Sequence, residues 1–347
     1  MTPQPINGFF PVLIQSRFGA RGNFELVTTH SGAGAADGAL AHFWRNNDDA
    51  PAYPWSLPTV FGTNAGPPAL VSPTMIESNF GSPGTLEVIC LGAAQVPAKE
   101  FLYFWRDSGP TFTWHGPDSL PITPPQGVTG NPALIQSRFG EQGNFELISP
   151  VFGGGLAHLW RDNDDPGYPW SEPTVFGGEL DGIEGVTMIQ SNFGTAGNLE
   201  VICSVASGMG SATQLYHFWR DSGPTFAWNG PCPLPIAPPG GVLGAPALIQ
   251  SRYGKRGNFE LVTPAKDGGL AHYWRDNDDP SQPWNGPTLF GGGLGVISWV
   301  SLIQSNFGDP GNLEVVCEIG PGQICHFWRD SGPTFAWHGP YPLASTV

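Results

Sequence analysis

The heptapeptide Leu13-Ile-Gln-Ser-Arg-Phe-Gly19 is one of six closely related segments in this chain of 347 residues. The others begin at Met75, Leu134, Met188, Leu248 and Leu302, so that successive copies start 54 to 62 residues apart. Each copy continues to a Gly-Asn turn, with Thr85 replacing Asn once, and to a Glu. It then reaches Trp-Arg, as in Phe43-Trp44-Arg45, and a second Trp about ten residues later. Self-similarity at such a period is typical of solenoids and propellers.

Each repeat contains four short runs that favour β-strands, separated by turns rich in Gly, Pro and Asp. In the third copy the runs are 132–137, 144–148, 156–161 and 173–177. No helical periodicity of useful length occurs. Four short strands per repeat are typical of a propeller blade. We therefore predict an all-β, six-bladed β-propeller of four-stranded blades, a single domain over residues 1–347. Its repeats lie at approximately 1–66, 67–125, 126–180, 181–239, 240–294 and 295–347.

Two kinds of repeat alternate along the chain. Odd copies contain Ser-Arg-(Phe/Tyr)-Gly and an acidic loop such as Arg161-Asp-Asn-Asp-Asp165, whereas even copies contain Ser-Asn-Phe-Gly and Arg-Asp-Ser-Gly-Pro-Thr-Phe, as in 220–226. Alternating blades close without a mismatched seam only in an even ring, which predicts pseudo-threefold symmetry from three double-blade units. A β-solenoid or several small domains are the alternatives, but no copy resembles a linker or a capping repeat. The second repeat departs most, with Glu77, Thr85 and Tyr103.

Composition excludes several classes of partner. Only 12% of residues are charged, and 14 Lys and Arg against 29 Asp and Glu give a net charge of −15. This disfavours nucleic acid and anionic membranes, which require a basic surface. No apolar run approaches a membrane span, and the first residues lack a basic signal-peptide region, so we expect a cytoplasmic protein or one secreted without a cleaved signal peptide. Five scattered Cys do not suggest a disulfide framework.

The second Trp of each repeat is the leading candidate for ligand binding. It lies between Pro or Gly residues and beside polar groups, a setting in which the indole face could stack on a sugar ring. Alternatively, these residues wedge adjacent blades apart. The six positions are Trp55, Trp114, Trp170, Trp228, Trp284 and Trp337.

Other recurring polar residues have structural and functional interpretations. One Glu, one Arg and usually one His recur per repeat, and six similar copies favour paired structural roles over six catalytic ones. The acidic loops around Asp48, Asp164 and Asp278 offer oxygen ligands for calcium, but they lack the EF-hand pattern and also suit tight turns. Calcium is therefore only an alternative, and no cofactor is otherwise expected. No hydrolase, zinc-protease, phosphate-loop or CxxC motif occurs.

The layout of strands, Gly-Asn turn, His-x-Trp and second Trp resembles β-propeller lectins of the tectonin and Photorhabdus-lectin kind. The resemblance covers the order of strands and aromatic residues in all six repeats, but the sequence motifs themselves differ from those of these lectins. It implies sugar sites between adjacent blades, against the second Trp set. The polar partners that it implies are Arg17, Arg138 and Arg252, or Asn79, Asn192 and Asn306.

We therefore expect a non-enzymatic, multivalent carbohydrate-binding protein whose partners are glycans or glycoconjugates. Weak sites repeated on a rigid ring gain avidity for a dense surface. The alternatives are an enzyme of the lyase or cyclase type at one mouth of the central channel, and a scaffold that binds other proteins.

Overall fold

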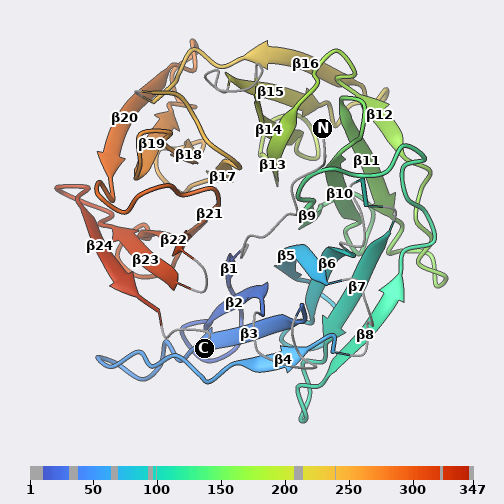
Figure 1. Cartoon of the computed structure of the whole chain (residues 1–347), viewed down its shortest axis with the longest axis horizontal. Coiled ribbons are helices and arrows are strands. Elements are labelled where there is room, and N and C mark those ends of the chain that lie inside the picture. Colours follow the sequence, from blue (N-terminus) through green and yellow to red (C-terminus); the bar gives the residue numbers. More distant parts are fainter. Residues whose placement is uncertain are drawn as a thin grey trace.

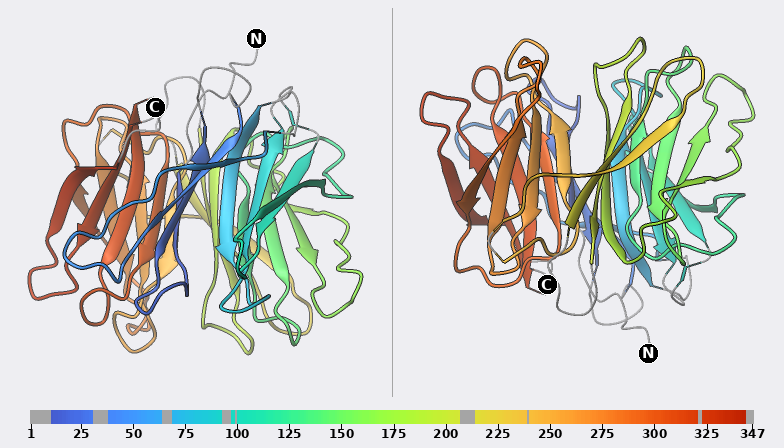
Figure 2. Two further views of the ribbon diagram at one scale, coloured as in Figure 1. Left: turned by 90° about the horizontal axis from the view of Figure 1, so that it is seen from below. Right: turned by 90° about the horizontal axis from the view of Figure 1, so that it is seen from above.

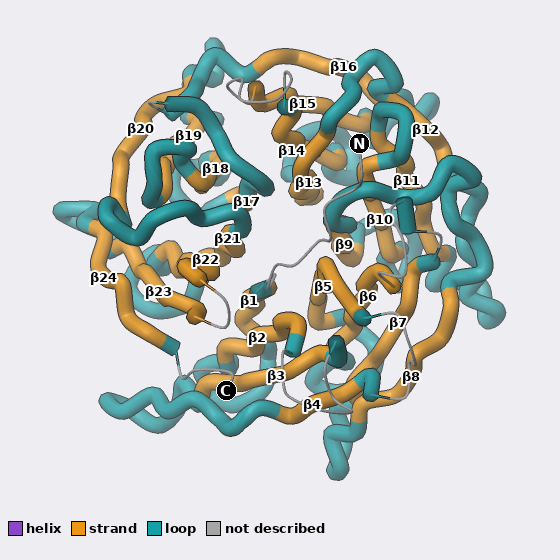
Figure 3. Tube along the Cα trace, viewed as in Figure 1, coloured by secondary structure: helices purple, strands orange, loops and turns teal. Residues whose placement is uncertain are grey.

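The computed structural model describes residues 11–30, 38–63, 69–92, 97–98, 100–206, 214–238, 240–320 and 323–343. In this part of the chain, 24 β-strands form six separate four-stranded antiparallel sheets. Figure 1 shows these sheets as blades around a common axis, and Figure 3 shows strands and loops but no helix. The predicted six-bladed β-propeller is thus confirmed. No described helix could cross a membrane.

Within every blade, strands adjacent in sequence are adjacent in the sheet. The first and second blades consist of β1 (Val12–Gln15), β2 (Phe24–Thr29), β3 (Leu40–Arg45), β4 (Thr59–Phe61), β5 (Leu70–Glu77), β6 (Leu86–Gly92), β7 (Phe101–Arg106) and β8 (Trp114–Ser119). The third and fourth consist of β9 (Ala133–Gln136), β10 (Phe145–Pro150), β11 (Leu156–Arg161), β12 (Thr174–Phe176), β13 (Ile183–Gln190), β14 (Leu199–Val205), β15 (Gln214–Arg220) and β16 (Trp228–Pro233). The fifth and sixth consist of β17 (Ala247–Gln250), β18 (Phe259–Pro264), β19 (Leu270–Arg275), β20 (Trp284–Phe290), β21 (Val300–Gln304), β22 (Leu313–Gly320), β23 (Gln323–Arg329) and β24 (Trp337–Pro342).

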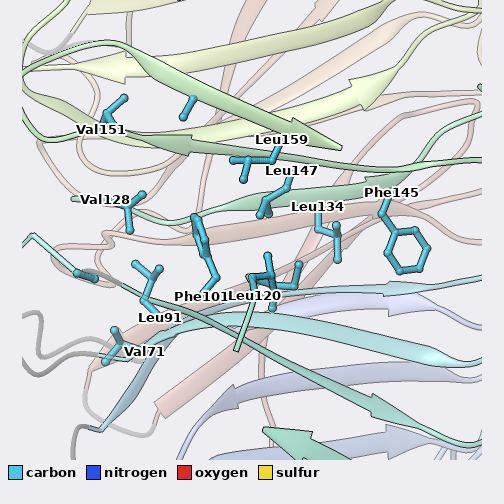
Figure 4. Close-up of a cluster of buried hydrophobic side chains, with 13 residues drawn as sticks. Val71, Leu91, Phe101, Leu120, Val128, Leu134, Phe145, Leu147, Val151 and Leu159 are labelled. Carbon is cyan, nitrogen blue, oxygen red and sulfur yellow. The ribbon is translucent and has the colours of Figure 1, made fainter. Parts of the chain in front are cut away.

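The hydrophobic core lies between blades. Second strands such as β2 and β6 are buried on both faces, because each is covered by a neighbouring blade on either side. One cluster joins Leu91 and Phe101 of the second blade to Phe145, Leu147 and Leu159 of the third (Figure 4). Comparable clusters occur at the other junctions. Burial of apolar surface thus stabilises the whole ring rather than individual blades.

The first strand of each blade faces the centre of the ring (Figure 1). These strands line a space of about 260 Å³, and the side chains around it are mainly Val, Leu, Ile and Met. Its lining, within the described residues, includes no Asp, Glu, His, Lys or Arg. The side view in Figure 2 shows the strands running between the two faces of the disc, where loops connect them.

A ring of hydrogen bonds links the inner ends of the blades. The amide Oε1 of Gln136 in the third blade accepts the backbone N–H of Asn79 in the second, at 2.8 Å. Equivalent bonds join Arg138 to Gln190, Asn192 to Gln250 and Arg252 to Gln304. The series ends at Asn306 and Gln15, which join the sixth blade to the first at 2.9 Å. In the described part of the chain, the first blade consists of β1 to β4 and the sixth of β21 to β24, and side-chain hydrogen bonds join these two sheets.

Glu77 takes the Gln position at the junction between the first and second blades. Its Oε2 accepts the backbone N–H and the Nε–H of Arg17, while its Oε1 is buried without a hydrogen-bond partner. In the third blade, by contrast, Gln136 Nε2 donates to two turn carbonyls at this place. Burial raises the pKa of Glu77, with Arg17 opposing that rise. The junction between the first and second blades therefore lacks the N–H donor that the side-chain amide of Gln136 supplies at the next junction.

We predict that Glu77→Gln stabilises the protein at pH 7 by about 1 kcal/mol, the typical net value of a hydrogen bond. Because the folded pKa is raised, the stability associated with Glu77 falls as pH rises above the carboxyl's unfolded value of about 4.3. The gain on substitution should accordingly be larger at pH 7 than at pH 4. Thermal unfolding at both pH values measures it, with the exposed Glu172→Gln as the matched control. An unchanged melting temperature at pH 7 would contradict this account.

Candidate ligand-binding site

Each blade buries one carboxylate in a small hydrogen-bonded network. In the first blade, Glu25 on β2 accepts a bond from Ser16 Oγ at 2.9 Å and lies 2.8 Å from His42 Nε2 on β3. The third, fourth, fifth and sixth blades repeat this pairing, and in the second blade Tyr103 donates its hydroxyl to Glu87. Glu25 is only 1% exposed, so these bonds are what make its burial tolerable.

An Arg from the following blade faces this carboxylate across the junction. Arg106 Nη1 of the second blade lies 3.8 Å from Glu25 Oε2, and Arg329 Nη2 has the same separation from Glu260 Oε2. The guanidinium of Arg106 also lies over the rings of Phe18 and Phe112. Each Trp-Arg signature thus contributes its Arg to the junction with the preceding blade.

A pocket of about 490 Å³ opens at the junction between the first and second blades. Its buried side chains include Glu25, His42 and Arg106, whereas Trp44 and Phe112 line it while remaining 38% and 47% exposed. The pocket therefore combines a polar, charged interior with an aromatic entrance. The opposite charges of Glu25 and Arg106 leave that interior close to neutral overall.

Two donors lining this pocket have no hydrogen-bond partner. Trp114 is held in place because its ring stacks on Phe61 of the first blade, with 3.9 Å between centroids and 3° between planes. Its Nε1–H is buried and unpartnered, and so is Nε–H of Arg106. Unsatisfied buried donors are costly and rare in folded proteins. Among the described residues, both N–H groups therefore lack an acceptor.

The same arrangement recurs at the other two odd–even junctions, which join the third blade to the fourth and the fifth to the sixth. Trp228 stacks on Phe176 and Trp337 on Phe290, each at 3.9 Å. Nε1 of both Trp residues is buried without a partner, as are Nη1 of Arg220 and Nε of Arg329. The unpartnered donors thus follow the predicted threefold pattern.

The even–odd junctions, which join the second blade to the third, the fourth to the fifth and the sixth to the first, are built differently. There the Arg is held by its own loop, as Arg45 Nε donates to Asn47 Oδ1 at 2.7 Å and the guanidinium lies 3.9 Å from the Phe24 ring centroid. Arg161 and Arg275 make the same contacts. At two of these junctions a His also covers the Trp face, because His115 stacks on Trp105 and His338 on Trp328. At these junctions the guanidinium groups are thus held by their own loops and by a Phe ring, although the hydroxyl of Tyr273, between the fourth and fifth blades, is buried without a hydrogen-bond partner.

The second Trp set therefore divides into two groups. Trp114, Trp228 and Trp337 belong to the odd–even junctions and combine stacking with an unpartnered N–H. Trp55, Trp170 and Trp284 are half-buried against the cores of the even–odd junctions. All six Trp side chains pack against the hydrophobic clusters between adjacent blades, which is the arrangement that the wedge alternative describes.

The two other predicted polar sets lie at the inner ends of the blades, outside the lining of the pocket between the first and second blades. The guanidinium groups of Arg17, Arg138 and Arg252 donate to the backbone carbonyls of Ser78, Ser191 and Ser305 in the next blade. The amides of Asn79, Asn192 and Asn306 donate to the carbonyls of Gln142, Arg256 and Arg21. Both sets connect blades.

The acidic loops stabilise turns through backbone contacts. Asp48 accepts the N–H groups of Ala20 and Arg21, at 2.7 and 2.8 Å. Asp164 and Asp278 bind the equivalent turns, and a backbone hydrogen bond from Lys255 lowers the pKa of Asp278. No group of three or more His, Cys, Asp or Glu side chains in the described residues is arranged to hold a metal. The turns therefore account for these carboxylates without an ion.

Sequence reasoning missed Arg106, Arg220 and Arg329 as site residues, because all six repeats contain an Arg here. The distinguishing signal lies two residues later, where odd repeats have Asn and even repeats have Ser. Asn47 reaches Arg45, whereas Ser108 instead accepts the backbone N–H of Ser82. The identity of that one residue separates a guanidinium held by its own loop from one with a free donor.

Solved structures with similar folds include a fungal lectin, a protein from Arthrobotrys oligospora and an intramolecular trans-sialidase. The Aleuria aurantia lectin, described as a six-bladed β-propeller with a novel fucose recognition mode, is 15% identical, with a TM-score of 0.62 over 98% of both chains. AofleA from Arthrobotrys oligospora is 10% identical, with a TM-score of 0.63 over 97% of this chain and 86% of that chain. The intramolecular trans-sialidase from Ruminococcus gnavus is 10% identical, with a TM-score of 0.58 over 90% of both chains.

These identities establish a shared fold and no more. Neither the models of protein families nor the curated proteins yield a match to the chain. The tectonin-like layout remains a prediction.

We predict that acid destabilises the fold through its buried histidines. Burial lowers the pKa of His42 and His272, with the bonded Glu opposing this. As pH falls below about 6.5, the unfolded histidines take up protons while the folded ones resist, so stability is lost. The melting temperature should fall between pH 7.5 and 5.5. The decrease should be smaller in the double variant His42→Gln/His272→Gln, whose amides do not titrate. Equal slopes would exclude these two histidines as the cause.

Proposed function

We propose that this protein is a lectin that binds a neutral sugar at its three odd–even junctions. The observation that carries the proposal is the trio of unpartnered Trp N–H groups, each accompanied by an unpartnered Arg N–H, at Trp114, Trp228 and Trp337. A sugar hydroxyl both donates and accepts hydrogen bonds. It could therefore accept from Trp114 and Arg106 while donating to Glu25, satisfying all three groups.

The charges and aromatic surfaces favour a neutral sugar over an acidic one. Glu25 and Arg106 balance each other, so a carboxylate ligand would meet the buried Glu without a spare cation. The exposed part of the Trp44 ring offers an apolar face of the kind on which sugar C–H groups stack. One structural neighbour, the Aleuria aurantia lectin, is described as having a novel fucose recognition mode and as a complex with alpha-methyl-L-fucoside, so α-L-fucosides are the first ligands to test.

Three similar sites on one rigid disc suit a multivalent partner. At the first of these junctions, Phe18 lies in the loop between β1 and β2, and Phe112 in the loop between β7 and β8. Because strands alternate in direction within each blade, the loop after the first strand and the loop after the third strand lie on the same face of the disc. Individually weak sites would then bind a glycan-coated surface with an avidity that no single site possesses.

We predict that calorimetry with methyl α-L-fucoside yields three sites per chain. In the triple variant Trp114→Phe/Trp228→Phe/Trp337→Phe, the stacking on Phe61, Phe176 and Phe290 is retained but the N–H donors are lost. Its affinity should fall about fivefold to tenfold, corresponding to roughly 1 kcal/mol per hydrogen bond.

The matched control is Trp55→Phe/Trp170→Phe/Trp284→Phe, which makes the same chemical change at the even–odd junctions and should leave affinity unchanged. A stoichiometry of six, or equal losses in the two triple variants, would refute the assignment to odd–even junctions. Absence of binding to fucosides and to every neutral sugar on a glycan array would refute the lectin itself.

A further inference from the structure

Three exposed phenylalanines lie at the entrances of the odd–even junctions. Phe112, Phe226 and Phe335 are 47%, 44% and 47% exposed, and all three have positive φ angles, of 48°, 47° and 51°. A bulky side chain in this left-handed region is strained, and glycine would adopt it freely. The equivalent residues of the other three blades have the same conformation, so it belongs to the turn and not to one kind of junction. What distinguishes the odd–even junctions is that this position is Phe in all three of them.

Contacts on one side hold each ring in place. Phe112 meets the ring of Phe18 edge-on, with 5.7 Å between centroids, and covers the guanidinium of Arg106 at 5.3 Å. Phe226 contacts Phe139 and Arg220, and Phe335 contacts Tyr253 and Arg329, in the same way. The rings are thus preorganised, so a ligand that stacks on them would lose little entropy in doing so.

The polarity of the pocket indicates which part of a ligand would reach these rings. Glu25, His42 and Arg106 are at most 7% exposed and would bind hydroxyl groups, whereas Phe112 contributes to the lining from the solvent side. If the hydroxyl groups of the sugar occupy the polar interior, the group attached to the sugar through its glycosidic bond lies at the entrance, beside Phe112. At the even–odd junctions the corresponding turn positions hold Tyr53, Tyr168 and Gln282, and the turn at Gln282 forms without an aromatic ring.

We propose that Phe112, Phe226 and Phe335 form an apolar subsite for the group attached to the bound sugar. That group is an aryl aglycone or the C–H face of a second pyranose. The inference rests on the proposed lectin function and adds that each site recognises a glycoside longer than one sugar.

The experiment compares methyl α-L-fucoside with p-nitrophenyl α-L-fucoside by calorimetry on the full chain. We expect the aryl glycoside to bind roughly threefold to tenfold more tightly, as befits one aromatic contact. In Phe112→Ala/Phe226→Ala/Phe335→Ala this preference should disappear, because the aryl glycoside loses more affinity than the methyl glycoside and the ratio of the two affinities falls to about one. Phe152→Ala, which removes an exposed ring that is absent from the pocket lining, should retain the preference.

The remaining outcomes each overturn a defined claim. Equal affinities of the unmodified protein for the two glycosides would refute the subsite and leave the lectin intact. Equal losses for both glycosides in the triple variant would show that the rings only support the Arg side chains, which also refutes the subsite. If neither glycoside binds, the fucoside-binding proposal fails and the subsite fails with it.

Discussion

A buried carboxylate at each blade junction is the constraint on which the rest of this propeller depends. A charge removed from water costs several kcal/mol unless it is compensated. Ser16 and His42 compensate Glu25 from within its own blade, and Arg106 approaches it from the next one. The carboxylate therefore fixes its own strands in register and attracts the neighbouring guanidinium. Glu25, His42 and Arg106 make contacts within and between the two blades, and the same side chains line the pocket between them.

Because odd and even repeats alternate along the chain, the ring contains two kinds of blade junction, which differ in how the Arg is bound. Where Asn47, Asn163 or Asn277 follows the Arg by two residues, the guanidinium is bound by its own loop and lies flat on a Phe ring. Where Ser108, Ser222 or Ser331 stands there, each guanidinium keeps a buried N–H without a partner. The residue at this position thus separates an Arg whose Nε is bound by Asn from one that lacks this bond, although Nε of Arg220 donates to the carbonyl of Phe226 in its own loop.

The repeats predict the fold completely, because period, strand pattern and even number of alternating copies all require the same ring. The site is predictable only in part. Trp114 is identifiable by its repetition, but its unpartnered N–H depends on stacking against Phe61, a residue of another blade. Arg17 and Asn79 look like ligand contacts in sequence because they are polar and recurrent. The structure instead shows them bonded to backbone carbonyls of the neighbouring blade, a partner that no side-chain pattern reveals.

The closure between the sixth and first blades has a consequence for modularity. Asn306 and Gln15 make the same contacts there that Asn79 and Gln136 make within the chain, and no strand of the described residues crosses from one blade to the other. The connection between the second and third blades adds backbone pairings of its own, because Val128 pairs with Ala98 and with Val151. A circular permutant opened between these two blades would therefore keep the inner hydrogen bonds for closure but would have to preserve these pairings. A two-blade fragment carries complementary edges of its own, so the ring is in principle a cyclic trimer written as one polypeptide.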